Sequence, residues 1–133
     1  MTWLLDTNIL IAISKQNPRL LPRLEQIDRQ AILLSSVVLA EIEYGIAKSA
    51  RQAHNRKVFD AITSCFPIQV FDREAAHHFG LLRADLEKRG CVIGPYDMMI
   101  AAHAVALGCT LVTDNTREFQ RVPNLRIENW LAA

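Results

Sequence analysis

Short apolar runs alternate with longer amphipathic stretches along the whole chain. The runs predict buried strands because they are rich in leucine, isoleucine and valine and end at polar residues. They cover residues 2–5, 31–34, 68–71, 110–113 and 125–127. Between them, helical spacing and capping residues predict helices over about 9–14, 18–29, 36–51, 54–65, 73–89 and 95–107.

Residues at the predicted boundaries support these elements. Asp72 stands at an N-cap position, Gly90 and Gly108 stand where helices end, and Pro95 opens the last long helix. Strands that alternate with helices form βαβ units with right-handed crossovers. The predicted fold class is therefore α/β, with a central twisted parallel sheet of about four to five strands and helices on both faces.

Composition and charge narrow the class of protein. The 133 residues, 50% of them hydrophobic and 22% charged, predict a single globular domain spanning 1–133 that folds without disulfides. The pattern predicts no membrane span and no signal peptide, so we expect a cytoplasmic protein. The net charge of +1 is uninformative, but basic residues gather in two segments, Lys48 to Lys57 and Arg117 to Arg126. A solvated surface explains them, and a nucleic-acid partner is permitted.

Two aspartates follow predicted strands. Asp6 comes after the first strand, and Asp114 comes after the strand at 110–113. Ligands of parallel α/β sheets bind beyond the carboxyl ends of the strands, so both carboxylates are expected at one edge. Either one alone is explained by a turn or a helix cap. Together they favour a functional site.

Two further acids lie on predicted helices. Asp97 lies in the first turn of the helix at 95–107, on the same stripe as Ile100 and Ala104, so it starts a face that points at the sheet. A favourable interaction with the helix dipole would also account for it. Glu41 lies in an almost wholly apolar helix, and periodicity does not distinguish it from Glu43.

Four converging carboxylates would require a cation or protons. Two carboxylates ~4 Å apart repel by about 4 kcal/mol at an effective dielectric near 20. An all-oxygen ligand set suits Mg²⁺ or Mn²⁺, and one or two such ions would support hydrolysis of a phosphodiester. The flanking polar residues either cap the backbone or orient water and phosphate; they are Thr7, Asn8, Thr113 and Asn115.

Four blocks of sequence resemble the PIN-domain family, and specifically its VapC toxin branch. The blocks are Leu4 to Ile9, Ser35 to Gly45, Ile93 to Ala104 and Leu111 to Phe119, followed by Arg121-Val122 and Glu128-Asn129-Trp130. The resemblance covers nearly the whole chain, and the order of the blocks makes it specific.

The resemblance implies a metal-dependent endoribonuclease that is the toxin of a bacterial toxin–antitoxin module. It assigns the Mg²⁺ or Mn²⁺ site and the catalytic role to Asp6, Glu41, Asp97 and Asp114, and selects Glu41 over Glu43. Several relatives carry Asn at the position of Asp114, so that position need not be an essential ligand. The implied reaction is attack of metal-activated water on RNA, with tRNA as the expected substrate, leaving a 5′-phosphate and a 3′-hydroxyl.

The resemblance also implies partners. It predicts a homodimer, a VapB-like antitoxin that blocks the site within a hetero-oligomer, and contact with DNA only through that antitoxin. An Arg or Lys of such a partner would form charge-assisted hydrogen bonds with the carboxylates.

Other functions fit less well. The first alternative is a catalytically silent PIN-like module that binds RNA or protein, and the complete acidic set disfavours it. A phosphatase of similar fold usually carries Asp-x-Asp after the first strand, where this chain has Asn8 as the third residue. A phosphorylated receiver domain is disfavoured because no lysine follows the strand at 110–113.

Overall fold

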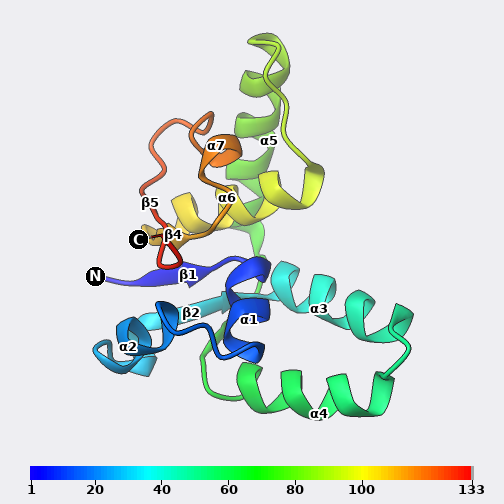
Figure 1. The fold of residues 1–133 in the computed structure, drawn as a ribbon. Helices are drawn as coiled ribbons and strands as arrows, with labels where there is room; N and C mark the ends of the chain where they lie inside the picture. Colours follow the sequence, from blue (N-terminus) through cyan, green and yellow to red (C-terminus); the bar gives the residue numbers. More distant parts are fainter. Residues whose placement is uncertain (133) are drawn as a thin grey trace.

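The computed structural model describes residues 1–132 and contains one parallel sheet in the order β3-β2-β1-β4-β5 (Figure 1). The strands are β1 (Trp3–Leu5), β2 (Ile32–Ser35), β3 (Ile68–Gln69), β4 (Thr110–Val112) and β5 (Ile127–Glu128). The central strand β1 pairs Trp3 with Ile32 on one side and with Thr110 on the other. The predicted fold class, a parallel sheet of four to five strands, is confirmed.

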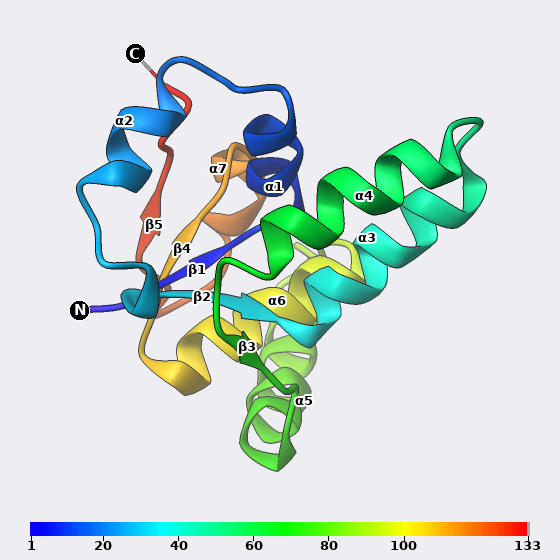
Figure 2. The same cartoon turned by 90° about the horizontal axis from the view of Figure 1, so that it is seen from below.

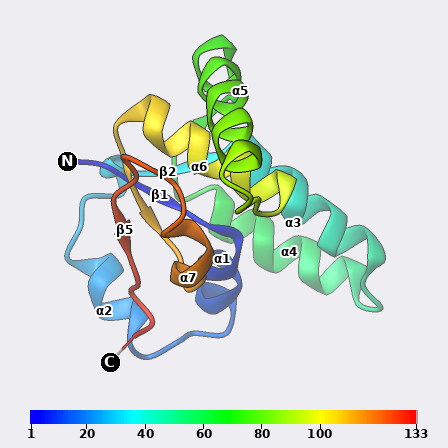
Figure 3. The same cartoon turned by 90° about the horizontal axis from the view of Figure 1, so that it is seen from above.

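Within residues 1–132, seven α-helices surround this sheet. They are α1 (Thr7–Ser14), α2 (Leu20–Glu25), α3 (Ser36–Lys48), α4 (Gln52–Thr63), α5 (Arg73–Lys88), α6 (Pro95–Leu107) and α7 (Thr116–Phe119). Helices α1, α2 and α4 lie on one face, and α5, α6 and α7 lie on the other (Figures 1 and 3). Helix α3 leaves the end of β2 and packs against both α4 and α6, and Figure 2 shows it beside α4 in a hairpin that extends past the sheet.

Several predicted elements need correction; the strand expected over 68–71 ends at Gln69, and the helix expected over 36–51 ends at Lys48. The helix expected over 18–29 is limited to Leu20–Glu25, because Asp28 caps a separate 3₁₀ turn at Arg29–Ala31 by accepting from the backbone of Gln30. The four-residue helix α7 was predicted as a turn, since one helical turn is too short to show periodicity. The last strand begins at Ile127, two residues later than predicted.

The core is built from the strands and the apolar stripes of the helices. Leu4, Leu5, Leu111 and Val112 are fully buried on the two central strands, as expected for a parallel sheet covered on both faces. Each such side chain contributes roughly 1.5–3 kcal/mol by leaving water. None of the helices within residues 1–132 is long and apolar enough to cross a bilayer.

One buried polar contact fixes α6 against the sheet. His103, which is 1% exposed, places Nδ1 2.8 Å from the Oγ of Ser35 at the end of β2. Ser35 Oγ also accepts from the backbone N–H of Val37 and so caps α3. Burial lowers the pKa of His103, which favours the neutral ring. The contact holds α3 and α6, the two helices that carry Glu41 and Asp97, in a fixed relation.

Candidate active site

The strand order creates a crevice between β1 and β4. The chain leaves β1 towards β2 and leaves β4 towards β5, so the connections diverge at this point of the sheet. In open α/β sheets, such a reversal of strand order is where ligands bind, beyond the carboxyl ends of the strands. Asp6 follows β1 and Thr113 follows β4, and the Thr113 hydroxyl donates to Asp6 Oδ2 at 2.7 Å.

Asp6 lies at the bottom of this crevice and is only 4% exposed. Its Oδ1 accepts from the backbone N–H of Thr7 at 2.8 Å, which starts α1, and its Oδ2 also accepts from Asn8 Nδ2 at 3.3 Å. Burial raises the pKa of Asp6 although the hydrogen bonds from Thr113 and Thr7 oppose the rise, and the nearby charges of Glu41 and Glu118 raise it further. Three hydrogen bonds therefore fix the position of this carboxyl, but none of the three donors carries a positive charge.

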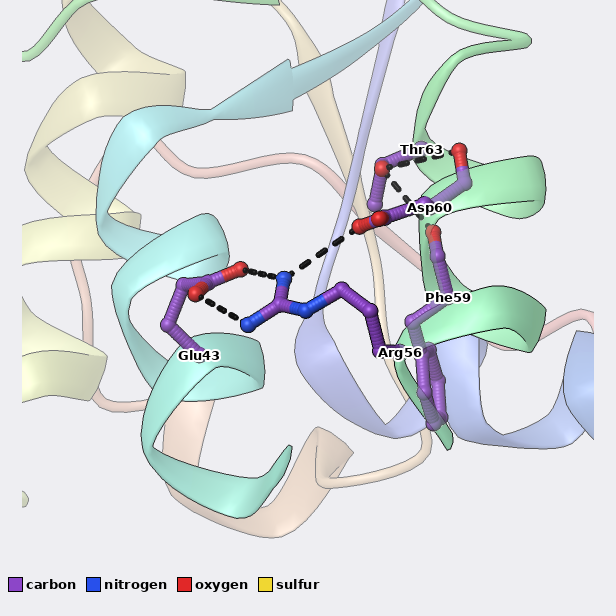
Figure 4. A network of polar contacts seen from close by, with 5 residues as sticks. All are labelled: Glu43, Arg56, Phe59, Asp60 and Thr63. Atoms are coloured by element: carbon purple, nitrogen blue, oxygen red, sulfur yellow. Dashed lines mark hydrogen bonds and ion pairs between the residues drawn. The ribbon is translucent and has the colours of Figure 1, made fainter. Parts of the chain in front are cut away.

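Glu41 approaches the crevice from α3. Its Oε1 accepts a hydrogen bond from the hydroxyl of Thr7 at 2.6 Å, and its charge contributes to the raised pKa of Asp6. Glu43 belongs to a different environment, because both its oxygens accept from the guanidinium of Arg56 on α4, at 2.6 and 2.8 Å (Figure 4). The structure therefore separates two glutamates that helical periodicity leaves equivalent.

Asp97 approaches from the opposite side, in the first turn of α6. Its pKa is raised to about 7, first by burial and then by the charges of Asp6, Glu118 and Glu41. Among residues 1–132, no lysine or arginine forms an ion pair with Asp6, Glu41 or Asp97. Near neutral pH, Asp97 is thus the acid of the crevice that most readily retains a proton.

Glu118 is a member of this group that sequence reasoning missed. Its Oε2 accepts from Asn115 Nδ2 at 2.6 Å, and its Oε1 accepts from the backbone N–H of Gly94 at 3.1 Å, just before α6. These bonds lower the pKa of Glu118, so it stays ionised, and its charge helps to raise the pKa of Asp97. In the sequence, Glu118 stands three residues after Asn115. It was not predicted as a site residue because the segment that forms α7 was interpreted as a turn.

Asp114 occupies a different position from the other acids. It is exposed, its backbone N–H donates to Asn8 Oδ1 at 3.2 Å, and its carboxylate accepts from Asn129 Nδ2 at 3.1 Å, beside β5. The carboxyl-edge rule correctly places its backbone next to α1. Its carboxylate lies at the rim, and the buried position after β4 belongs to Thr113.

The four supporting polar residues each hold an acid or its neighbour. Thr7 donates to Glu41, Thr113 donates to Asp6, and Asn115 donates to Glu118. Asn8 connects the two strand ends, since its amide lies 3.3 Å from Asp6 Oδ2 and 3.4 Å from Thr113 Oγ1. Their interactions join α1, α3 and α7 around the crevice.

The donor chemistry of the crevice fits a hard divalent cation. Asp6, Glu41, Asp97 and Glu118 offer carboxylate oxygens, which Mg²⁺ and Mn²⁺ prefer to nitrogen or sulfur. Their mutual repulsion appears directly in the raised pKa of Asp97. In the part of the chain that the structure describes, no three acidic, histidine or cysteine side chains form a ready metal-ligand cluster. Carboxylates without a counter-ion repel one another, so a cation would draw them closer.

Comparison with known proteins identifies a family of sequences related to this chain. The PIN domain family matches residues 3–125. Ribonuclease VapC2 of Rickettsia felis is 42% identical over 132 residues, and the tRNA(fMet)-specific endonuclease VapC of Salmonella typhimurium is 38% identical over 130 residues, each alignment covering 98% of both chains.

Solved structures show the same relationship in three dimensions. The chain matches VapBC2 from Rickettsia felis, bound to a DNA fragment from its promoter, with a TM-score of 0.91 and 38% identity. It matches DNA-bound VapBC from Salmonella typhimurium with a TM-score of 0.92 and 38% identity. The alignments cover 98% of this chain and 99% and 98% of those chains, respectively. The chain therefore belongs to the PIN domain family and, within it, to the VapC ribonucleases.

Proposed function

We propose that this ribonuclease hydrolyses RNA phosphodiesters, with tRNA as the substrate, at a Mg²⁺ or Mn²⁺ site formed by Asp6, Glu41 and Asp97 together with Glu118. The observation that carries this assignment is the gathering of these acids at the end of β1, where Thr113 and Thr7 hold Asp6 and Glu41 and the neighbouring charges add to burial in raising the pKa of Asp97. Perturbed acids in a crevice at a reversal of strand order are typical of catalytic sites. Asp114 is assigned an outer role, through water or Asn129, because of its exposed position.

The side chains of the crevice have distinct parts in this proposal. Asp6, immobilised by the three donors around it, is the fixed ligand. Glu41 and Glu118 are oriented by Thr7 and Asn115 and can adjust towards a cation. Asp97 releases its proton when positive charge enters the crevice, because that charge offsets both the burial and the repulsion that raise its pKa. When bound, the cation supplies a more acidic water and neutralises charge on the phosphodiester.

The proposal extends to partners. The Rickettsia felis and Salmonella typhimurium neighbours are VapBC complexes, and the Salmonella typhimurium relative is named a tRNA(fMet)-specific endonuclease. We infer that this chain is likewise the toxin of a toxin–antitoxin pair, acts in the cytoplasm as a single PIN domain over residues 1–133, and forms a homodimer. A VapB-like antitoxin would cover the acidic crevice and would provide the only contact with DNA.

Cleavage of purified tRNA tests the assignment. Asp6→Asn and Asp97→Asn keep the shape of each side chain but remove its charge, and each is expected to abolish Mg²⁺- or Mn²⁺-dependent cleavage. Excess chelator should silence the parent chain in the same way. The matched control is Asp85→Asn, which alters a partly exposed acid that pairs with Arg89 on α5. Undiminished cleavage by both crevice variants would refute the assignment, and cleavage in chelator would refute the metal.

A further inference from the structure

The two tyrosines of the chain both stand beside proposed catalytic acids. Tyr44 lies one helical turn after Glu41 on α3, and Tyr96 immediately precedes Asp97 in the first turn of α6. Tyr44 is 66% exposed and Tyr96 is 57% exposed, so neither ring serves the core. Exposed tyrosine rings next to a polar site are available for contact with a ligand, since their faces stack and their hydroxyls remain in water.

Tyr44 lies on the same side of α3 as Glu41 and Lys48. Residues three and four apart share one side of a helix, so Glu41, Tyr44 and Lys48 follow one another along it. The Nζ of Lys48 lies 4.9 Å from the centre of the Tyr44 ring. A cation at this distance from an aromatic face is attracted to it and is held near the exposed ring. One edge of the crevice therefore offers an aromatic surface and a positive charge together.

The acidic crevice itself repels the phosphates of RNA. Asp6, Glu41, Asp97 and Glu118 place four acidic groups where the scissile phosphate must enter, and none of them forms an ion pair with a lysine or arginine among residues 1–132. The attraction that brings RNA to the site must then come in part from groups around it. Stacking of bases on aromatic rings is independent of charge and of base identity, and lysine neutralises neighbouring phosphates.

We propose that Tyr44 and Tyr96 stack two unpaired nucleobases of the RNA substrate and that Lys48 contacts a phosphate beside the base on Tyr44. The inference rests on the proposed ribonuclease function and adds a substrate requirement. Bases within an A-form duplex are stacked on their neighbours and have no free face, whereas bases of loops and single strands do. The RNA would therefore present unpaired bases to the two exposed rings on α3 and α6.

Binding measurements test this without relying on cleavage. In an Asp6→Asn background, the affinity for a fluorescein-labelled single-stranded RNA of mixed sequence is measured by anisotropy in Mg²⁺. Tyr44→Leu and Tyr96→Leu remove the ring and are each expected to weaken binding by about 5- to 100-fold. Tyr44→Phe and Tyr96→Phe keep the ring and should bind within about twofold of the parent. A blunt RNA duplex of equal length should bind less tightly and be insensitive to these changes.

Two further measurements make the assignment specific. Lys48→Gln should reduce the slope of log affinity against log salt by about 0.7, the value for one phosphate contact on a single strand. RNA carrying 5-iodouridine should photo-crosslink to Tyr44 or Tyr96, identified by mass spectrometry. The control is Leu81→Ala, since Leu81 is 58% exposed on α5, away from the acids, and should bind RNA as the parent does.

The outcomes separate this inference from the proposed function. If the chain with intact Asp6 cleaves tRNA but both leucine variants bind RNA as tightly as the parent, the stacking role is overturned and the ribonuclease assignment stands. If the leucine variants lose only affinity for a VapB-like antitoxin, the rings serve a protein partner, which also overturns it. Failure of metal-dependent cleavage by the parent would instead overturn the proposed function.

Discussion

Two glutamates on α3, only two residues apart, show how environment determines the role of an acid. Glu43 faces α4, where Arg56 donates to both its oxygens, and this lowers the pKa of the glutamate. Glu41 faces the crevice, where its partner is the neutral hydroxyl of Thr7 and its neighbours are other acids. One site satisfies its charges within the chain, whereas the other leaves an excess of negative charge that protons or an incoming cation can balance.

Replacing each of these two glutamates with glutamine should give the largest difference in the rate of RNA cleavage. Glu41→Gln is expected to reduce metal-dependent RNA cleavage by at least about 100-fold, the loss typical of removing one electrostatic contact to a reacting centre. Glu43→Gln, on the same helix, should change the rate by less than about threefold. Initial rates on purified tRNA at saturating Mg²⁺ provide the measurement. Equal losses in the two variants would show that α3 contributes shape rather than charge.

Glu118 and Asp114 extend the comparison to the strand β4 side of the crevice. Glu118→Gln removes an ionised neighbour of Asp97 and is expected to lower cleavage by about 10- to 100-fold. Asp114→Asn alters an exposed carboxylate that contacts Asn129, and a loss of less than about tenfold is expected. The two rates are compared at several Mn²⁺ concentrations. A greater loss of cleavage for Asp114→Asn would assign the role of the fourth acid to Asp114, at the end of β4, and not to Glu118 on α7.

Asp97 should make the folded chain sensitive to pH in the absence of metal. Its pKa is 3.8 as an ordinary carboxyl and about 7 in the folded chain, so between these values the folded state holds a proton that the unfolded state has lost. The free energy of unfolding therefore falls as the pH rises from about 4 to 7 and remains lower above 7.

Asp97→Asn removes this titration and should be more stable than the parent at pH 8 by about 1–3 kcal/mol, after allowance for solvent screening. Near pH 4 the difference should be small. Urea unfolding in chelator at the two pH values measures it, and addition of Mg²⁺ should stabilise the parent more than the variant. A variant less stable than the parent at pH 8 would contradict the account of electrostatic strain in the crevice.

The smallest effect is expected on the paired side of α3. Arg56 bridges Glu43 and Asp60 at the surface of the hairpin formed by α3 and α4 (Figure 4). Exposed ion pairs contribute little to stability and weaken further in salt. Arg56→Ala should lower the thermal unfolding midpoint slightly, less in 1 M salt than in dilute buffer, and leave cleavage unchanged. A strong loss of activity would show that the hairpin influences the crevice.

Much of the fold could be predicted because its signals are local. Apolar runs, caps such as Asp72 and the αL glycine at Gly108 predicted strand and helix positions that the structure reproduces. The helix at 18–29 was wrong because Asp28 offers its own cap to the backbone, a local competition that periodicity does not detect. Helix α7 was missed because four residues contain too little pattern.

The candidate site was predictable where the chain direction determines position. Asp6 is placed by the end of β1, and Asp97 by the start of α6. The distinction between Glu41 and Glu43 depends on which neighbouring helix each one meets, and Glu118 depends on the path of the chain after β4. Both positions depend on tertiary structure, so residue spacing alone could not predict them. For Glu41, the family resemblance made the choice that spacing left open.

The pairing of β1 with β4 also determines when the crevice can exist during protein synthesis. Asp6 is synthesised before its partner Thr113, which lies 107 positions later in the chain, and Asn115 and Glu118 follow Thr113. A nascent chain that stops before β4 contains Asp6 but lacks Thr113, whose hydroxyl donates a hydrogen bond to it. The site is therefore assembled only after β4 and α7 have been synthesised, and a chain that stops before β4 has no formed site.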